Sequence, residues 1–216
     1  PSGPNPSGPN PSGPSGWTSK LNALPLAPRS SKSFASQLRF VVKLADDLSM
    51  QRRRGTELLE GALTNPLPVD LLNGMLIYRN WIYLLPTRFP AGAQIASVDS
   101  LRQKNFRWQL SRQKALESSM EVESWDPAAT SDLPRIVEIM MFHDAVGAAR
   151  YTGLKHEVLS FLDFSDVLTS ERCILIGKLA NPVTQLHGDD GLGDAIQIDQ
   201  DLSMIRLVMP VTTPRR

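Results

Sequence analysis

Histidine and aspartate side chains in the second half of the chain are the groups best suited to metal binding or proton transfer. They are His143, Asp144, His156, His187, Asp189 and Asp190. Imidazole nitrogens and carboxylate oxygens bind divalent metals when several of them converge from suitably spaced positions. The three histidines show no ligand spacing, so we expect His143 and Asp144 to lie on a helix surface. We therefore predict neither a metal site nor a cofactor.

Two short matches to known enzymes involve the same residues. The pair His143-Asp144 resembles the ligand pair of the HD metal-dependent phosphohydrolases, which implies a metal centre completed from other helices. The triplet Gly188-Asp189-Asp190 resembles that of viral RNA polymerases, in which paired carboxylates bind two catalytic metals. The other polymerase motifs are missing and Gly and Asp favour turns, so we interpret this triplet as a turn. A phosphohydrolase using His143 and Asp144 stays open as an alternative.

Nucleophilic catalysis has little support in the sequence. The only cysteine, Cys173, lies in the apolar run Cys173-Ile174-Leu175-Ile176 and has no histidine nearby in sequence. A buried, inert thiol in a reducing compartment is the expected state. The sequence also lacks G-x-S-x-G and the phosphate-binding G-x-x-x-x-G-K-[ST]. We do not expect an enzyme.

Arginines provide the candidate binding site, for nucleic acid or another anionic surface. The site comprises Arg52, Arg53, Arg54, Arg107 and Arg112. The first three form a compact cationic cluster at an expected loop. The last two flank Trp108 in a segment that mixes cations with aromatic rings, a composition suited to phosphates and bases. In a strand, however, Arg107 and the Trp108 ring would face opposite sides, which favours a core strand with a solvated basic face.

Charge is distributed unevenly along the chain. The first 56 residues contain eight basic and two acidic residues, a net charge of +6. The remaining 15 basic and 20 acidic residues give −5. Such segregation indicates an N-terminal segment that contacts a polyanion or docks on the acidic body of another copy.

A Pro-Ser-Gly-Pro repeat fills the first sixteen residues and indicates a flexible arm over residues 1–33, followed by a folded body over residues 34–216. The repeated peptide resembles the Pro-[Ser/Thr]-Ala-Pro peptide with which viral matrix and Gag proteins recruit host factors, but we interpret it as a linker. The start at Pro1 indicates a processed product or a fragment. The longest apolar stretch, residues 71–85, is interrupted by polar residues and too short for a transmembrane segment.

The body is expected to have an α+β fold, with helices in its N-terminal half and short antiparallel strands in its C-terminal third. Apolar residues at helical spacing and N-capping residues predict helices over 56–63, 70–85 and 134–150. Good helix formers predict a further helix over 111–120. Alternating or branched apolar runs predict strands over 34–44, 106–110, 158–168, 173–179, 195–198 and 204–211.

The layout of a flexible arm, a basic segment and an acidic body is similar to that of small viral matrix or coat proteins. We therefore predict a non-enzymatic structural protein of the virion or host cytoplasm that self-assembles into a homo-oligomer. Its basic segment would contact RNA or an anionic membrane. Two alternatives remain, a nucleic-acid-binding module without an assembly role and the metal-dependent phosphohydrolase using His143 and Asp144.

Overall fold

The computed structural model describes Gln37, Arg39, Val41 and residues 50–111, 125–128, 131–157, 159–181 and 202–213. The chain divides into two units, Pro1–Lys43 and Leu44–Arg216, and the second contains nearly all of the described residues. The expected arm, the strand over 34–44 except for three isolated residues, most of the helix over 111–120 and the strand over 195–198 lie outside the described residues. The following description concerns the second unit.

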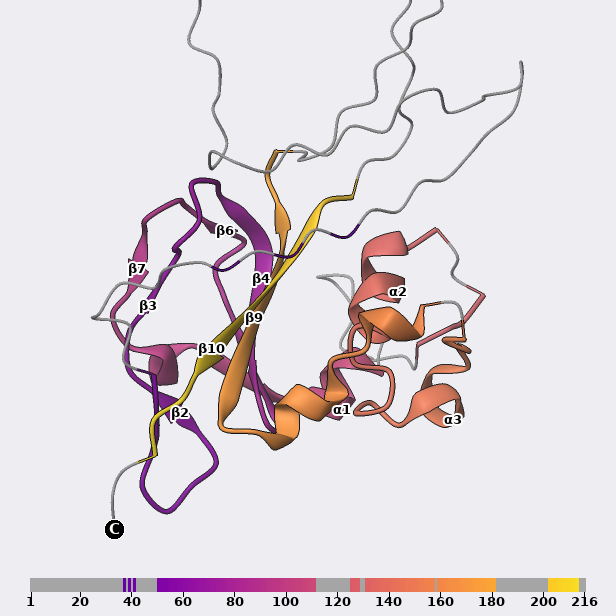
Figure 1. The fold of residues 1–216 in the computed structure, drawn as a ribbon, viewed down its shortest axis with the longest axis horizontal. Helices are drawn as coiled ribbons and strands as arrows, with labels where there is room; N and C mark the ends of the chain where they lie inside the picture. The colour runs from indigo at the N-terminus through magenta and orange to yellow at the C-terminus, as the bar shows by residue number, and fades with distance from the viewer. Residues whose placement is uncertain are drawn as a thin grey trace, which may run out of the picture. The chain divides into compact units, whose positions relative to one another are not determined.

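An antiparallel sheet forms the centre of this unit (Figure 1). Its strands follow the order β10-β9-β4-β5-β8, and β6 pairs with the start of β4. The strands are β4 (Leu71–Tyr78), β5 (Trp81–Leu84), β6 (Arg88–Phe89), β8 (Arg102–Asn105), β9 (Arg172–Leu179) and β10 (Met204–Pro210). Strands β4 and β5 form a hairpin around the two-residue turn Arg79-Asn80. The long segment between β8 and β9 leaves the sheet and contains all the α-helices of the described residues.

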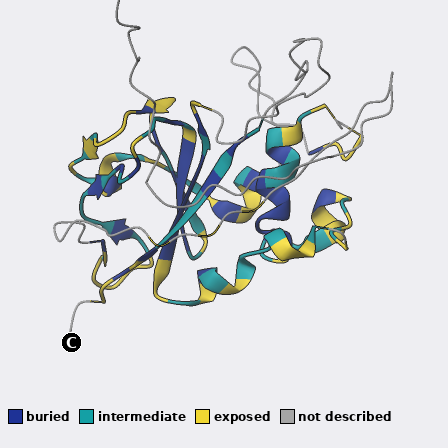
Figure 2. Ribbon diagram, turned by 45° about the horizontal axis from the view of Figure 1, so that its top comes forward, coloured by how far each residue is buried: buried dark blue, intermediate teal, exposed yellow. Residues whose placement is uncertain are grey.

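Successive residues of the inner strands face opposite sides of the sheet, and both sides are buried. In β4, Leu76 belongs to one apolar cluster and Ile77 to the other. In β9, Leu175 and Ile174 divide in the same way. Strands buried on both faces are apolar at nearly every position. Figure 2 shows the buried residues of the central strands in dark blue. Cys173 belongs to the same apolar run, is fully buried as expected, and burial raises the pKa of its thiol to about 12.

One face of the sheet is covered by a layer of short strands, called the strand layer. Its segments come before and after the β4–β5 hairpin along the chain. The layer consists of β1 (Gln51–Arg52), β2 (Leu59–Glu60), β3 (Leu63–Thr64), β7 (Gln94–Ile95) and the 3₁₀-helix η1 (Val98–Ser100). The backbone N–H of Leu59 donates to the Tyr83 hydroxyl at 2.6 Å, which links the layer to β5. The buried Asn65 side chain donates to three backbone carbonyls, those of residues 69, 89 and 90. These bonds supplement the two-residue ladders between β1 and β2 and between β3 and β7.

The other face is covered by a helical layer. This layer consists of α1 (Phe106–Leu110), α2 (Leu133–Met140), α3 (Ala148–Thr152), η2 (Ser160–Leu162) and η3 (Ser165–Thr169). Asp132 caps α2 by accepting from the Arg135 N–H at 3.2 Å. The helix expected over 134–150 is therefore present in part, as α2 and α3 separated by a turn at residues 141–147.

The expected arrangement of helices and strands is wrong. Strands dominate, lie in the middle and C-terminal parts, and form a six-stranded sheet, whereas the few helices lie between β8 and β9. Residues 70–85 form the β4–β5 hairpin because a strand buried on both faces is as continuously apolar as a core helix. At 56–63, the Thr56 hydroxyl accepts from the N–H of Leu58, two residues on, and so stabilises a turn and not a helix.

Shorter elements also differ from the expectation. Residues 106–110 are helical because Asn105 caps them, its side chain accepting from the Trp108 N–H at 3.0 Å. The described part of 158–168 forms two 3₁₀-helices, and Asp163 accepts from the Ser165 N–H at the start of the second. The strands expected over 173–179 and 204–211 are confirmed as β9 and β10.

Candidate metal centre

A turn in the helical layer, residues 141–147, contains the pair His143-Asp144. Phe142 anchors this turn, because its fully buried ring packs edge-on against Phe106 of α1 with centroids 5.4 Å apart. The carbonyl of Met141 accepts from the N–H of Phe164 at 2.8 Å. These contacts hold the turn against the segment that leads into η3.

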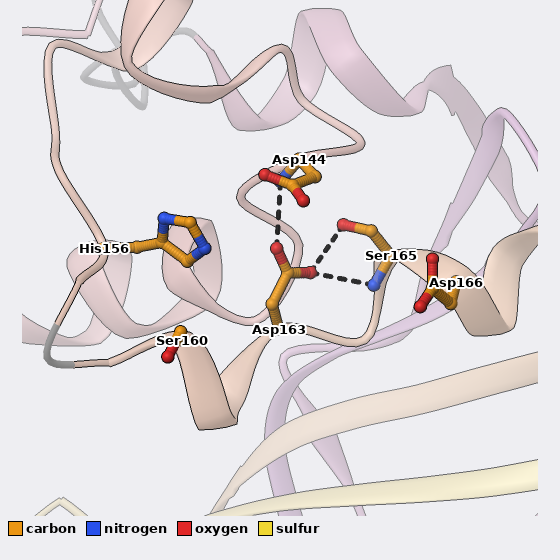
Figure 3. Close-up of a pocket in the computed structure, with 6 residues that line it drawn as sticks. All are labelled: Asp144, His156, Ser160, Asp163, Ser165 and Asp166. Carbon is orange, nitrogen blue, oxygen red and sulfur yellow. Dashed lines mark hydrogen bonds between the residues drawn. The ribbon is translucent and has the colours of Figure 1, made fainter.

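Four side chains converge beside this turn. They are His143, Asp144, His156 and Asp163, and each offers one possible ligand atom within 4.8 Å of the others. His143 is buried, and the Asp144 side chain is 68% exposed. The side chains of Asp144, His156 and Asp163 line a cavity of about 210 Å³ together with Ser160, Ser165 and Asp166 (Figure 3). Three of the four donors therefore line one polar pocket, and the buried His143 lies beside it.

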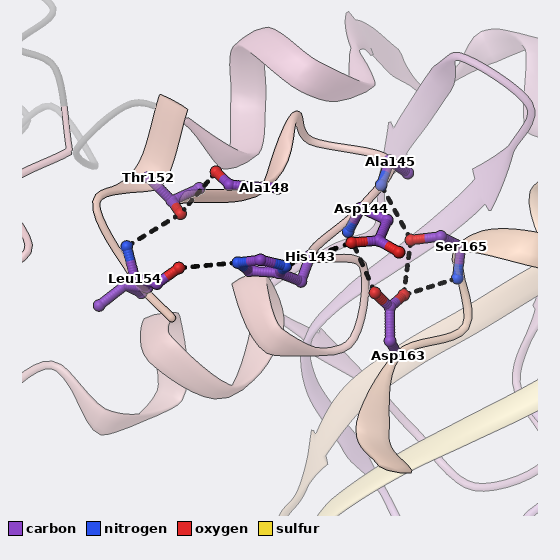
Figure 4. A network of polar contacts seen from close by, with 8 residues as sticks. All are labelled: His143, Asp144, Ala145, Ala148, Thr152, Leu154, Asp163 and Ser165. Carbon is purple, nitrogen blue, oxygen red and sulfur yellow. Dashed lines mark hydrogen bonds and ion pairs between the residues drawn. The ribbon is translucent and has the colours of Figure 1, made fainter. Parts of the chain in front are cut away.

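His143 is oriented by a backbone carbonyl (Figure 4). Its Nε2 lies 2.7 Å from the carbonyl oxygen of Leu154, so this nitrogen carries a hydrogen and donates it. Its Nδ1 lies 3.4 Å from an oxygen of Asp144. In the neutral ring, Nδ1 then presents its lone pair toward the cluster. A backbone carbonyl that fixes the tautomer in this way is typical of metal-binding histidines.

Asp163 is held by three hydrogen bonds. Its Oδ1 accepts from the N–H and the hydroxyl of Ser165, at 2.8 and 2.5 Å, and its Oδ2 accepts from the N–H of Asp144 at 3.0 Å. The Ser165 hydroxyl oxygen also accepts from the N–H of Ala145 at 2.9 Å. The carboxylate therefore joins the two turns, and it retains further lone pairs that can bind a cation.

The rings of His143 and His156 are stacked, with centroids 4.0 Å apart and planes inclined by 21°. Imidazole binds metal ions in its neutral form, through a ring nitrogen that carries no hydrogen. Hydrogen bonding and turn formation account for Asp163, but neither explains why a second histidine lies against the first.

Part of this cluster was predictable from the sequence. His143 was expected on a helix surface but is buried in a turn. His156 was a candidate further ligand, and Asp163 was not. His187, Asp189 and Asp190 lie outside the described residues. One signal could have revealed the cluster, namely that all four side chains come from 21 consecutive residues.

The arginines of the predicted anionic site are distributed over both layers. Arg52 lies in β1, and its guanidinium is 3.9 Å from the carboxylate of Glu171. Arg53 and Arg54 are exposed in the turn that follows β1. All three belong to the strand layer; Arg53 and Arg54 lie at the expected loop, whereas Arg52 lies in a strand.

The other two predicted arginines belong to a different region. Arg107 lies in α1 of the helical layer, and Arg112 lies outside the described residues. The described residues thus do not assemble the predicted arginines into one surface. Their part in binding stays a prediction.

Comparisons with protein-family models, curated proteins and solved structures found no match. Among the described residues, no helix is both long enough and apolar enough to cross a membrane. The function must therefore be argued from the geometry of the side chains.

Proposed function

We propose that this protein binds a divalent transition-metal ion through His143, Asp144, His156 and Asp163. The convergence of two imidazoles and two carboxylates within 4.8 Å supports this proposal most directly. The carboxylates balance the charge of a divalent cation, and the mixed nitrogen and oxygen donors suit Zn²⁺ or another first-row metal. Small side-chain movements would bring the four donors into one coordination sphere.

A structural role for the metal fits the surrounding chain. Four protein ligands complete the tetrahedral sphere that Zn²⁺ adopts in structural sites. The helix α3 has five residues and stands between two glycines, Gly147 and Gly153, so it has little stability of its own. A bound metal would connect the turns on either side of α3 and stabilise the whole segment.

Metal-dependent hydrolysis of a phosphate ester is the narrower alternative, and the exposure of Asp144 favours it. If this carboxylate moves away, three ligands and one open position remain, as in catalytic zinc sites. The charge of the pocket argues against hydrolysis of a phosphate ester. Two carboxylate ligands neutralise the metal, and Asp166 adds a further negative charge. An anionic ester would gain little attraction, so metal binding without hydrolysis is the primary proposal.

Elemental analysis and calorimetry test metal binding. The full chain, stripped with a chelator and titrated with Zn²⁺ and Mn²⁺, should bind about one equivalent of the preferred metal. At a hundredfold excess over Kd, binding should stabilise the fold by about 2.7 kcal/mol and raise its melting temperature. No saturable binding of any first-row metal would overturn the proposal.

Two variants assign the binding to the cluster. His156→Ala should abolish tight binding, and because His156 is only partly buried the variant is expected to fold. Asp166→Asn is the matched control, since Asp166 lines the same pocket without belonging to the ligand cluster. Equal affinities in His156→Ala and the wild type would contradict the assignment. Release of nitrophenol from bis(p-nitrophenyl) phosphate by the loaded wild type, but not by His156→Ala, would establish the hydrolase alternative.

A second proposal rests on the segregation of charge along the sequence. The first 56 residues have a net charge of +6 and the rest −5, which would favour contacts between copies in a self-assembling protein of the virion or host cytoplasm. Assembly of the full chain, measured by sedimentation, should weaken as the salt concentration is raised. Replacing Arg52, Arg53 and Arg54 together with Ala should weaken it further. Assembly that responds to neither change would count heavily against this proposal.

A further inference from the structure

A second group of side chains, from the helical layer and the adjoining strand β8, combines exposed rings with cations. This basic–aromatic surface comprises Lys104, Arg107, Trp108, Arg150 and Tyr151. The Lys104 ammonium lies 5.3 Å from the centre of the Trp108 ring, and the guanidinium groups of Arg107 and Arg150 lie 5.4 and 5.8 Å from the centre of the Tyr151 ring. The two rings are 39% and 51% exposed. Elements far apart in sequence, α1 and α3, thus share one surface.

The helical form of residues 106–110 creates this surface. Asn105 caps the helix, and Phe106 and Leu110 face the core. Arg107 and Trp108 consequently both face outward, whereas a strand would have placed them on opposite sides. The turn anchored by Phe142 against Phe106 then leads into α3, where Tyr151 meets Arg107.

Among the described residues, no carboxylate pairs with the cations of this surface. In the part of the chain that the structure describes, Lys104, Arg107 and Arg150 form no ion pair, and their contacts are with the two rings. Burial lowers the pKa of Lys104, and the nearby positive charges of Arg102 and Arg135 lower it further. The surface therefore has an excess of positive charge that would attract an anionic ligand.

Single-stranded nucleic acid matches this combination better than other polyanions. A single strand offers unpaired bases to stack on exposed rings and phosphates to contact nearby cations. A DNA duplex hides its base faces, so the rings would gain nothing from it. A membrane surface would require a broad apolar face, but the large apolar side chains of α1, Phe106 and Leu110, are buried in the core.

We propose that the basic–aromatic surface binds single-stranded nucleic acid. Trp108 and Tyr151 stack on bases, and Lys104, Arg107 and Arg150 contact phosphates. This activity is separate from metal binding, because none of these five residues belongs to the metal cluster.

Fluorescence anisotropy with labelled oligo(dT) and oligo(U) tests the proposal on the full chain. The wild type should bind both single strands and bind the matching duplex more weakly. Trp108→Ala and Tyr151→Ala should each weaken binding by about 5- to 150-fold, the range expected for loss of one stacked base. Phe161→Ala is the matched control, because it removes a ring that is 48% exposed but lies outside the surface.

The cations are tested by the salt dependence of the same binding. Arg107→Ala should reduce the slope of log affinity against log salt by about 0.7, the value for one phosphate contact on a single strand. Arg107→Lys should restore the slope, and Arg172→Ala, the change of an exposed arginine in β9, should leave it unchanged. With metal removed from both proteins by a chelator, His156→Ala should bind oligonucleotides like the wild type, so failure of the metal proposal leaves this one standing.

Several results would overturn the proposal. Binding that is equal in the Tyr151→Ala and Phe161→Ala variants would exclude stacking at this surface. Stronger binding to the duplex would exclude single strands as the preferred ligand. Binding to vesicles containing phosphatidylserine, without binding to either oligonucleotide, would assign the surface to membranes instead. Circular dichroism of each variant confirms that the fold is retained.

Discussion

The strand layer and the helical layer cover the two apolar faces of one sheet, and two arginines of the sheet near the strand layer have different partners from two arginines of the helical layer. Near the strand layer, Arg79 bonds to Glu57 at 2.8 Å and to Glu171 at 2.6 Å, and Arg88 bonds to Asp70. In the helical layer, the exposed Arg107 and Arg150 contact only a tyrosine ring among the described residues.

This difference indicates where binding is to be sought. A carboxylate partner offsets the positive charge of a cation, so a paired cation attracts an anionic ligand less strongly. The segment between β8 and β9 contains both Arg107 and Arg150, which form no ion pair among the described residues, and the cluster of His143 and His156. We infer that the helical layer provides the proposed metal and single-strand sites, whereas the strand layer provides the assembly contacts proposed for Arg52, Arg53 and Arg54. The following predictions test this division.

The largest effect is expected from adjacent core residues of β4 that face different layers. Leu76 and Ile77 are both fully buried, one under each layer. Leu76→Ala and Ile77→Ala should each lower the free energy of unfolding by about 2–5 kcal/mol, measured by urea denaturation. Hydrogen exchange should accelerate first in β2 for Leu76→Ala and first in α2 for Ile77→Ala. Identical exchange patterns would show that the two layers do not respond separately.

A smaller effect is expected at two glycines with positive φ, one near each layer. Gly92 has φ +68° and open space around it, whereas Gly147 has φ +103° and the Tyr151 ring against its backbone. Alanine at either position should destabilise the fold by about 1–2 kcal/mol, because its side chain disfavours this conformation.

Only the change at Gly147 should also alter ligand binding. A Cβ there would lie 2.3 Å from the Tyr151 ring, which must move. Gly147→Ala should therefore weaken oligonucleotide binding in the anisotropy assay, whereas Gly92→Ala should leave it unchanged. Weaker binding in Gly92→Ala as well would show that global destabilisation, and not the position of the ring, is responsible.

The smallest effect is expected from the hydrogen bond between Tyr78 and Glu171, 2.6 Å long. This bond and the Arg79 guanidinium lower the pKa of Glu171 from its ordinary value of 4.5. A carboxyl with a lowered pKa stabilises the fold above pH 4.5, and the contribution is lost as pH falls through the folded-state pKa. The contribution should stay below about 1 kcal/mol, because Glu171 is 41% exposed.

The variant Tyr78→Phe tests this bond at both ends of the pH range. In acid, denaturation curves of the variant should depend less on pH than those of the wild type. In alkali, burial and the bond to Glu171 raise the pKa of Tyr78 from 10 to about 12, so the wild type should lose stability between these values. The variant should lack that alkaline loss. Parallel curves for the two proteins would contradict the assignment.

The sequence predicted the two C-terminal strands better than the hairpin β4–β5. Short branched runs identified β9 and β10. The hairpin β4–β5 was read as a helix because apolar residues occupy both of its faces, which removes the alternation that distinguishes a strand. The start of the helix predicted over 134–150 lies one residue from that of α2, which begins at Leu133 after the capping Asp132.

The candidate sites were only partly predictable. Arg107 and Trp108 were recognised as a suitable pair, but the wrong secondary structure placed them on opposite sides. Tyr151 gave no signal, because its contact with Arg107 depends on how α1 and α3 pack. Asp163 was missed for a related reason, since hydrogen bonds between two turns, and not sequence spacing, bring it to His143.

The single cysteine has a practical consequence for labelling chemistry. Cys173 is fully buried, and the raised pKa of its thiol keeps it protonated and unreactive toward alkylating probes at neutral pH. A cysteine introduced at an exposed position could therefore be modified selectively without replacing the native one. In Ser160→Cys, a spin label or fluorophore would stand at the wall of the histidine pocket and would report directly on a paramagnetic or quenching ion bound there.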